Sequence, residues 1–391
     1  MREGLPRSRK GTSTVDAPPA TGAWREGDPP GRRRFLPLDG PLALEAGGSL
    51  SGVHLAYETW GELNAARDNA VLVLHALTGD SHVSGPAGEG HVTAGWWDTL
   101  VGPGRTLDPA RWFVVAPNVI GGCQGSTGPS SPGPGGRPWG GRFPLVTVRD
   151  TVHAEATLAD ALGVGRWACV VGGSMGGMRA LEWAATEPAR VARLFLLASP
   201  AASTADQIGW AAPQIAAIRS DPGWHGGDYH DLPPGAGPHR GLGVARRIAH
   251  LSYRSGDELA ERFGRDPQDG EDPLRGGRFA VESYLDHHAE KLVRRFDAAS
   301  YVRLTEMMHA HDVGRGRGGI AEGLGRVTAH TLVAGVSSDR LYPLADQAQL
   351  AGGISRSVPL RVLDSPYGHD GFLIEAAAVS ALLAELLATG S

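Results

Sequence analysis

A single serine stands between two pairs of glycines in the segment VVGGSMGGMRALEW, residues 170–183. Residues 172–176 satisfy the motif G-x-S-x-G, with an apolar run before them and a helical pattern after them. In that context the motif predicts a sharp strand-to-helix turn that presents Ser174 as the nucleophile of acyl transfer. The glycines are required because such a turn leaves no room for neighbouring side chains. The plainer alternative is a tight turn whose serine does no chemistry.

A serine nucleophile needs a base, usually histidine, and the base needs a carboxylate to orient it. After a G-x-S-x-G turn the chain order is serine, then aspartate or glutamate, then histidine, with both partners on loops after late strands. Asp339 follows the apolar run HTLVAGVSSD, and His369 follows PLRVLDSPYGHDG. We therefore predict a triad of Ser174, Asp339 and His369.

Acyl transfer also needs two backbone N–H groups that stabilise the oxyanion. One comes from the residue after the nucleophile and the other from a loop after an early strand. Met175 is the first candidate, and Leu77 in the loop LHALTGDSH is the second.

Other chemically active residue types make weaker candidates. His309 and His311 could be metal ligands, but no third donor has suitable spacing, and we predict no metal site. Cys123 is a nucleophile by type only, because its loop offers no comparable turn. His287 and His288 are expected to be solvated or satisfied within the core.

Short apolar runs alternating with helical patterns predict a mostly parallel sheet covered by helices, an α/β-hydrolase fold. Residues 46–200 and 327–389 carry the strand signals and form the expected core domain. Residues 201–326 read as helices with hardly any strand signal, which predicts an inserted helical lid. Residues 1–35 are rich in Pro, Gly, Ser, Thr and Arg and predict a disordered arm. The expected strands lie in 54–61, 70–77, 112–118, 167–173, 191–199, 330–339 and 359–365.

Composition restricts the class of partner. The chain has 391 residues, 41% of them hydrophobic, with a net charge of −5 and a pI near 6.3. This mild charge does not favour nucleic acid or a membrane surface, so a small-molecule role is expected. Two cysteines without C-x-x-C spacing exclude a disulfide framework and fit a reducing compartment. With neither an apolar membrane span nor a secretory signal pattern, we expect a cytoplasmic protein.

Taken together, these segments resemble the homoserine O-acetyltransferase family, α/β-hydrolase-fold enzymes of methionine biosynthesis. The resemblance runs in the family's order from about residue 50 to 375 and leaves only the N-terminal arm unmatched. It rests on long segments, namely HALTGDSH, NVIGGCQGSTGPSS, FPLVTVRD, VVGGSMGGMRALEW, GDYH, ARRIAHLSYR, HDVGRGRGG, SSDRLYP and YGHDGFL.

The resemblance implies roles for individual residues. Ser174, Asp339 and His369 fall on the family's triad, Arg246 falls on an arginine expected to bind the substrate carboxylate, and Asp370 falls on an aspartate expected to contact the amino acid. It also implies a two-step reaction in which acetyl-CoA acylates the serine and L-homoserine then accepts the acetyl group. Acetyl-CoA is then a co-substrate, no cofactor is needed, and a homodimer formed through the lid is expected.

Three other functions remain open from the sequence. The same scaffold serves O-succinyltransferases that act on homoserine or serine, because one basic side chain could select the larger donor. A serine esterase would keep the triad without needing Arg246 and Asp370. A catalytically silent binding protein would be expected to lack a triad member, and none is missing here.

Overall fold

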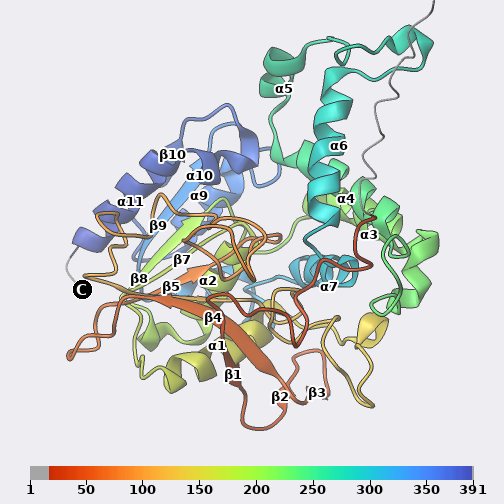
Figure 1. Cartoon of the computed structure of the whole chain (residues 1–391). Coiled ribbons are helices and arrows are strands. Elements are labelled where there is room, and N and C mark those ends of the chain that lie inside the picture. Colours follow the sequence, from red (N-terminus) through yellow and green to blue (C-terminus); the bar gives the residue numbers. More distant parts are fainter. Residues whose placement is uncertain (1–16, 390–391) are drawn as a thin grey trace, which may run out of the picture.

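The computed structural model describes residues 17–389, and its centre is an eight-stranded sheet (Figure 1). The strand order is β1-β4-β6-β5-β7-β8-β9-β10, in which β1 and β4 are antiparallel to their neighbours and the rest are parallel. The strands span Arg34–Pro37 (β1), His54–Trp60 (β4), Ala70–Leu74 (β5), Phe113–Pro117 (β6), Cys169–Gly173 (β7), Arg193–Leu197 (β8), His330–Val336 (β9) and Arg361–Leu363 (β10). Every predicted strand segment contains one of them, and a small hairpin of β2 (Leu42–Ala43) and β3 (Ser49–Leu50) lies apart.

The central strands are apolar on both faces because helices or loops cover both. Alternate residues of a strand point to opposite faces, so in β8 Leu194 joins the core on one side of the sheet and Phe195 the core on the other. Helices α1 (Val148–Ala161), α2 (Met175–Thr186), α8 (Ile320–Gly325) and α9 (Leu344–Gly353) contribute to the first core, and α10 (Gly371–Ile374) and α11 (Ala376–Ala388) to the second. The predicted architecture, a mostly parallel sheet covered by helices, is thus confirmed.

Five helices between β8 and β9 stand to one side of the sheet and are called the lid below (Figure 1). They are α3 (Ala205–Arg219), α4 (His239–Tyr253), α5 (Gly256–Phe263), α6 (Ala280–Val293) and α7 (Ala298–His309). Helix α4 packs between α3 and α6. The lid meets the core through a separate apolar cluster that includes Leu77, Met175 and Leu304. The lid therefore packs close to the two residues, Leu77 and Met175, that are predicted to supply the oxyanion N–H groups.

Two predicted boundaries need correction. Residues 1–16 of the predicted arm lie outside the described residues, but residues 17–35 are ordered against the body of the protein. Thr21 donates a hydrogen bond to Asp297 (2.8 Å), Trp24 stacks on Phe35 at 4.9 Å, and Phe35 already belongs to β1. At the other boundary, residues 311–326 belong to the core rather than to the lid. Val313 and Leu324 are buried in the first core cluster.

Among the described residues, no single helix has the length and apolar character needed to cross a membrane. Only when the two consecutive helical segments Gly368–Ile374 and Ala376–Ala388 are counted as one are they long and apolar enough, and the chain bends by 67° between them.

Candidate active site

Ser174 lies at the turn between β7 and α2, at the carboxyl edge of the sheet. Its backbone has φ 57° and ψ −127°, a strained conformation for a residue with a side chain. A Cβ added to Gly172 would lie 2.2 Å from the carbonyl oxygen of Gly176, and one added to Gly176 would lie 2.1 Å from that of Leu74. The flanking glycines are therefore required by close backbone approach, and the turn holds the Ser174 hydroxyl in one place.

The structure brings Ser174, His369 and Asp339 together from three separate loops. His369 Nε2 lies 2.9 Å from Ser174 Oγ, and His369 Nδ1 lies 2.7 Å from Asp339 Oδ2. The other carboxylate oxygen, Asp339 Oδ1, accepts the backbone N–H groups of Leu341 (2.8 Å) and Tyr342 (2.9 Å). An ionised carboxylate only accepts hydrogen bonds, so Nδ1 of His369 carries the proton and Nε2 is free to accept that of Ser174.

Aromatic rings surround the imidazole of His369. The ring centroids of Tyr342, Phe372 and Tyr253 lie 5.0, 5.3 and 5.7 Å from that of His369. Burial raises the pKa of both tyrosines, so both phenols stay neutral at physiological pH. The rings fix the orientation of the imidazole and keep bulk water away from it.

Two backbone N–H groups near Ser174 have no hydrogen-bond acceptor among the described residues. Met175 is the first residue of α2, where an N–H has no intrahelical partner. No hydrogen bond within residues 17–389 uses the N–H of Met175 or of Leu77. Leu77 and Ser174 line the same cavity, whose other walls come mainly from α3, α7 and Tyr342. Both predicted oxyanion donors therefore lie near Ser174 and are not used by another group within residues 17–389.

Arg246, on α4, forms no direct ion pair or hydrogen bond with the other described residues. Its Nε and Nη1 atoms are buried without a hydrogen-bond partner among the described residues, and its guanidinium lies 5.6 Å from the centroid of the Tyr253 ring. Leaving a buried donor unpaired costs free energy, which a bound anion would recover. Because Tyr253 also lines the cavity of Ser174, this anion would bind beside the predicted triad.

Asp370 lies next to His369 and faces two arginines. Arg254 Nη1 is 3.6 Å from Asp370 Oδ2, although Arg254 is also paired with Glu258. Burial raises the pKa of Asp370, while the positive charges of Arg246 and Arg254 oppose that rise. A carboxylate and a guanidinium thus lie close together near one imidazole, a pattern that complements the ammonium and carboxylate of an amino acid.

The weaker candidates from the sequence lie in surroundings that do not favour a catalytic role. Cys123 is buried, and desolvation raises the pKa of its thiol to about 12, so it is no nucleophile at neutral pH. His311 is buried and hydrogen-bonds the carbonyl of Pro200 (3.2 Å). His287 is exposed, whereas His288 is half-buried and stacks on His250 at 4.0 Å.

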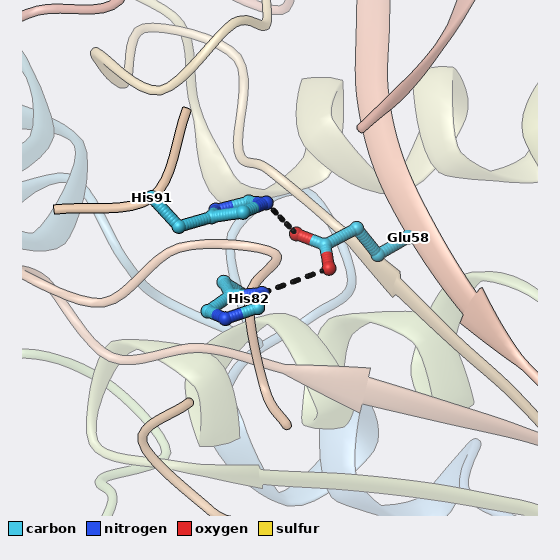
Figure 2. Close-up of side chains that lie close together, drawn as sticks. All are labelled: Glu58, His82 and His91. Atoms are coloured by element: carbon cyan, nitrogen blue, oxygen red, sulfur yellow. Dashed lines mark hydrogen bonds and ion pairs between the residues drawn. The ribbon is translucent and has the colours of Figure 1, made fainter. Parts of the chain in front are cut away.

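A cluster of metal-ligand residue types that the sequence did not reveal lies elsewhere in the fold. Glu58, His82 and His91 are buried with their ligand atoms within 4.8 Å of one another (Figure 2). The two imidazoles stack at 3.8 Å with 13° between their planes. An ion about 2 Å from a ligand nitrogen of each ring must lie close to both ring planes, which stacked rings do not allow.

Hydrogen bonds instead explain this cluster as a structural one. His82 Nδ1 lies 3.0 Å from Glu58 Oε2, and its Nε2 lies 3.2 Å from the carbonyl of Pro86, so both nitrogens act as donors. Burial opposes protonation, but the contact with Glu58 raises the pKa of His82 overall. His91 Nε2 accepts the backbone N–H of Arg32 (3.0 Å). The cluster therefore fastens the segment before β1 to β4 and to the loop that follows β5.

The sheet, the strained serine at its carboxyl edge and the adjacent histidine and aspartate define an α/β-hydrolase. Residues 69–376 match the family model described as alpha/beta hydrolase fold. Among curated relatives, the homoserine O-acetyltransferase of Thermobifida fusca (strain YX) is 69% identical over 370 residues, covering 95% of this chain and 97% of the relative. The chain belongs to the homoserine O-acetyltransferase family.

Solved structures agree on the fold and include hydrolases. The crystal structure of a homoserine O-acetyltransferase from Bacillus anthracis is 26% identical, with a TM-score of 0.82 over 91% of this chain and 97% of that one. An acetylester hydrolase from Corynebacterium glutamicum is 27% identical, with a TM-score of 0.77 over 92% of this chain and 97% of that one. Transfer and hydrolysis thus occur on the same scaffold, and the acceptor must be argued from the site.

Proposed function

We propose that the chain is a homoserine O-acetyltransferase, which moves the acetyl group of acetyl-CoA to the hydroxyl of L-homoserine and thereby serves methionine biosynthesis. The observation that carries this proposal is Arg246, whose buried Nε and Nη1 atoms lie beside the triad without a hydrogen-bond partner among the described residues. An esterase needs no such group, whereas an amino-acid acceptor supplies a carboxylate that matches the planar fork of arginine. The identity to relatives of that name supports the same conclusion.

The reaction proceeds in two steps through Ser174. His369 Nε2 takes the hydroxyl proton while Ser174 Oγ attacks the thioester carbon, and the N–H groups of Leu77 and Met175 stabilise the oxyanion. The carbon–sulfur bond then breaks, and the CoA sulfur leaves with the proton from His369. In the second step His369 takes the proton of the homoserine hydroxyl, whose oxygen attacks the acyl-serine, and Ser174 regains its proton.

Arg246 and Asp370 make homoserine a better acceptor than water. Arg246 binds the carboxylate and Asp370 the ammonium group, so the γ-hydroxyl is held beside the acyl-serine rather than meeting it by diffusion. Such positioning converts a bimolecular step into an effectively unimolecular one. The lid covers the same region and limits the access of water.

Product analysis with two donors and two acceptors tests the proposed function. We expect rapid formation of O-acetylhomoserine from acetyl-CoA and homoserine, with slow turnover of succinyl-CoA or serine. Rapid succinyl transfer without acetyl transfer would identify an O-succinyltransferase. Equal release of CoA with and without an amino acid, with acetate as the product, would identify an esterase.

Acid should weaken the use of homoserine more than it weakens acyl transfer from a substrate that does not contact Asp370. Because the pKa of Asp370 is raised above the ordinary 3.8, its carboxylate is lost at a higher pH than that of an exposed aspartate. Below that pKa the ammonium of homoserine loses its partner, so kcat/KM for homoserine falls with pH. The measurement is the ratio of this value to kcat/KM for p-nitrophenyl acetate, which uses the same serine and histidine and therefore cancels any pH dependence common to both substrates. A ratio that does not change with pH, or that changes identically in Asp370→Asn, would contradict the role of Asp370.

The location and assembly of the protein are also proposed. Both cysteines are free, which supports a reducing compartment such as the cytoplasm. We also propose that two chains pair through the lid, as the resemblance to the family implies. Sedimentation of the purified protein as a monomer at micromolar concentration would refute the dimer.

A further inference from the structure

A second pocket lies on the lid side of the loop that follows β5, and its walls carry an excess of positive charge. We call it the basic pocket. Its charged and polar lining includes Thr78, Asp80, Arg246, His288, Lys291 and Arg295. Three of these residues are arginine or lysine, against one acidic residue, Asp80, which is half-buried and whose pKa is raised by desolvation. The pocket therefore favours an anion.

The basic pocket adjoins the cavity that contains Ser174. Leu77 lines the nucleophile's cavity, and Thr78, its neighbour in the chain, lines the basic pocket. Arg246 lines the basic pocket while its guanidinium covers the ring of Tyr253, which lines the nucleophile's cavity. The two cavities are therefore neighbours, separated by Arg246, Tyr253 and the segment of Leu77 and Thr78.

The positively charged side chains of this pocket differ in how many hydrogen bonds they form with the rest of the protein. Arg295 is held by the carbonyl of Thr78 (2.9 Å). Arg246 is half-buried at the inner end and lacks partners for two nitrogens. Lys291 is exposed and forms no hydrogen bond or ion pair with the rest of residues 17–389. The chain contains only one other lysine, Lys10, against 35 arginines. A lysine at position 291 is therefore unusual for this protein.

We propose that the basic pocket binds the phosphate groups of the acyl-CoA donor, with Lys291 as their principal contact at the mouth and the pantetheine arm directed past Arg246 to Ser174. This inference rests on the proposed function and adds the donor's binding site to it. Arg246 remains the anchor of the homoserine carboxylate, because its two unpartnered nitrogens are buried whereas Lys291 meets solvent. Since donor and acceptor react in successive steps, both can use this entrance in turn.

Donor kinetics of Lys291→Ala test the proposal. An exposed charge contact is worth on the order of 1 kcal/mol, so we expect KM for acetyl-CoA to rise about fivefold with KM for homoserine and kcat little changed. S-acetylpantetheine, which carries the thioester without phosphates, should be used equally well by both proteins. Lys291→Arg should restore most of the donor affinity. Arg240→Ala is the matched control, because Arg240 is an exposed cation of the same lid that lines a different cavity.

These outcomes separate failure of the inference from failure of the proposed function. An unchanged KM for acetyl-CoA in Lys291→Ala, or an equal loss with both thioesters, would overturn the phosphate site while homoserine acetylation continued. Absence of O-acetylhomoserine with either thioester in the unmodified protein would refute the proposed function itself.

Reductive methylation gives a second measurement that does not depend on turnover. Lys291 is the only lysine among the described residues, so its modification can be followed by peptide mass spectrometry, with Lys10 as an internal reference. We expect CoA to protect Lys291 and pantetheine not to protect it. Equal modification of Lys291 with and without CoA would contradict the proposal.

Discussion

Replacing Ser174 with alanine is expected to lower kcat for acetyl transfer by about 10⁴-fold or more, because the reaction loses the atom that forms the acyl intermediate. The backbone N–H groups of Leu77 and Met175 would remain, so thioester binding should change little. The measurement is the initial rate of CoA release with saturating acetyl-CoA and homoserine. Ser220→Ala, which removes an exposed serine at the end of α3, is the matched control and should keep its rate within about twofold. Activity of Ser174→Ala within tenfold of the unmodified protein would exclude the proposed nucleophile.

Replacing Arg246 with alanine should raise KM for homoserine by about 100-fold, because a bidentate, charge-assisted contact to the carboxylate is lost. KM for acetyl-CoA should change much less. Arg246→Lys should recover only part of the loss, since an ammonium keeps the charge without the planar fork. The neighbouring Arg247 is the control, because it is paired with Asp286 (2.6 Å) and lines a cavity on another face of α4.

The two kinetic constants together decide the role of Arg246. A selective rise in KM for homoserine supports a carboxylate anchor. Equal rises for homoserine and acetyl-CoA would show that the guanidinium acts on the site as a whole. Normal constants for both substrates would mean that the unpartnered guanidinium binds neither of them.

The sequence predicted those parts of the fold that depend on local pattern. Strands such as β5 and β7 are uninterrupted apolar runs, so their burial could be inferred directly. β1 was missed because it is a short edge strand among prolines and arginines, and its pairing with β4 is a long-range contact. Residues 17–35 are held in place by contacts with residues far away in the sequence, such as the hydrogen bond from Thr21 to Asp297. Local pattern does not reveal such contacts.

The site was predictable to the extent that its geometry is encoded in motif and chain order. The turn at Ser174 and the loops of Asp339 and His369 follow from strand ends, and the structure brings their side chains within 2.9 Å. Arg246 was identified only by resemblance, since spacing alone fits a surface helix. The Glu58 cluster could not be predicted, because its members come from separate loops and strands with no motif.

The acyl-enzyme is the most direct test of the central claim. Purified protein is mixed with acetyl-CoA without homoserine, its intact mass is measured, and homoserine is then added while the products are analysed. The account predicts one added acetyl group per chain on Ser174, absent from Ser174→Ala, that homoserine removes rapidly to give O-acetylhomoserine. An acetyl group on another residue, or one released as acetate at the same rate with and without homoserine, would contradict it.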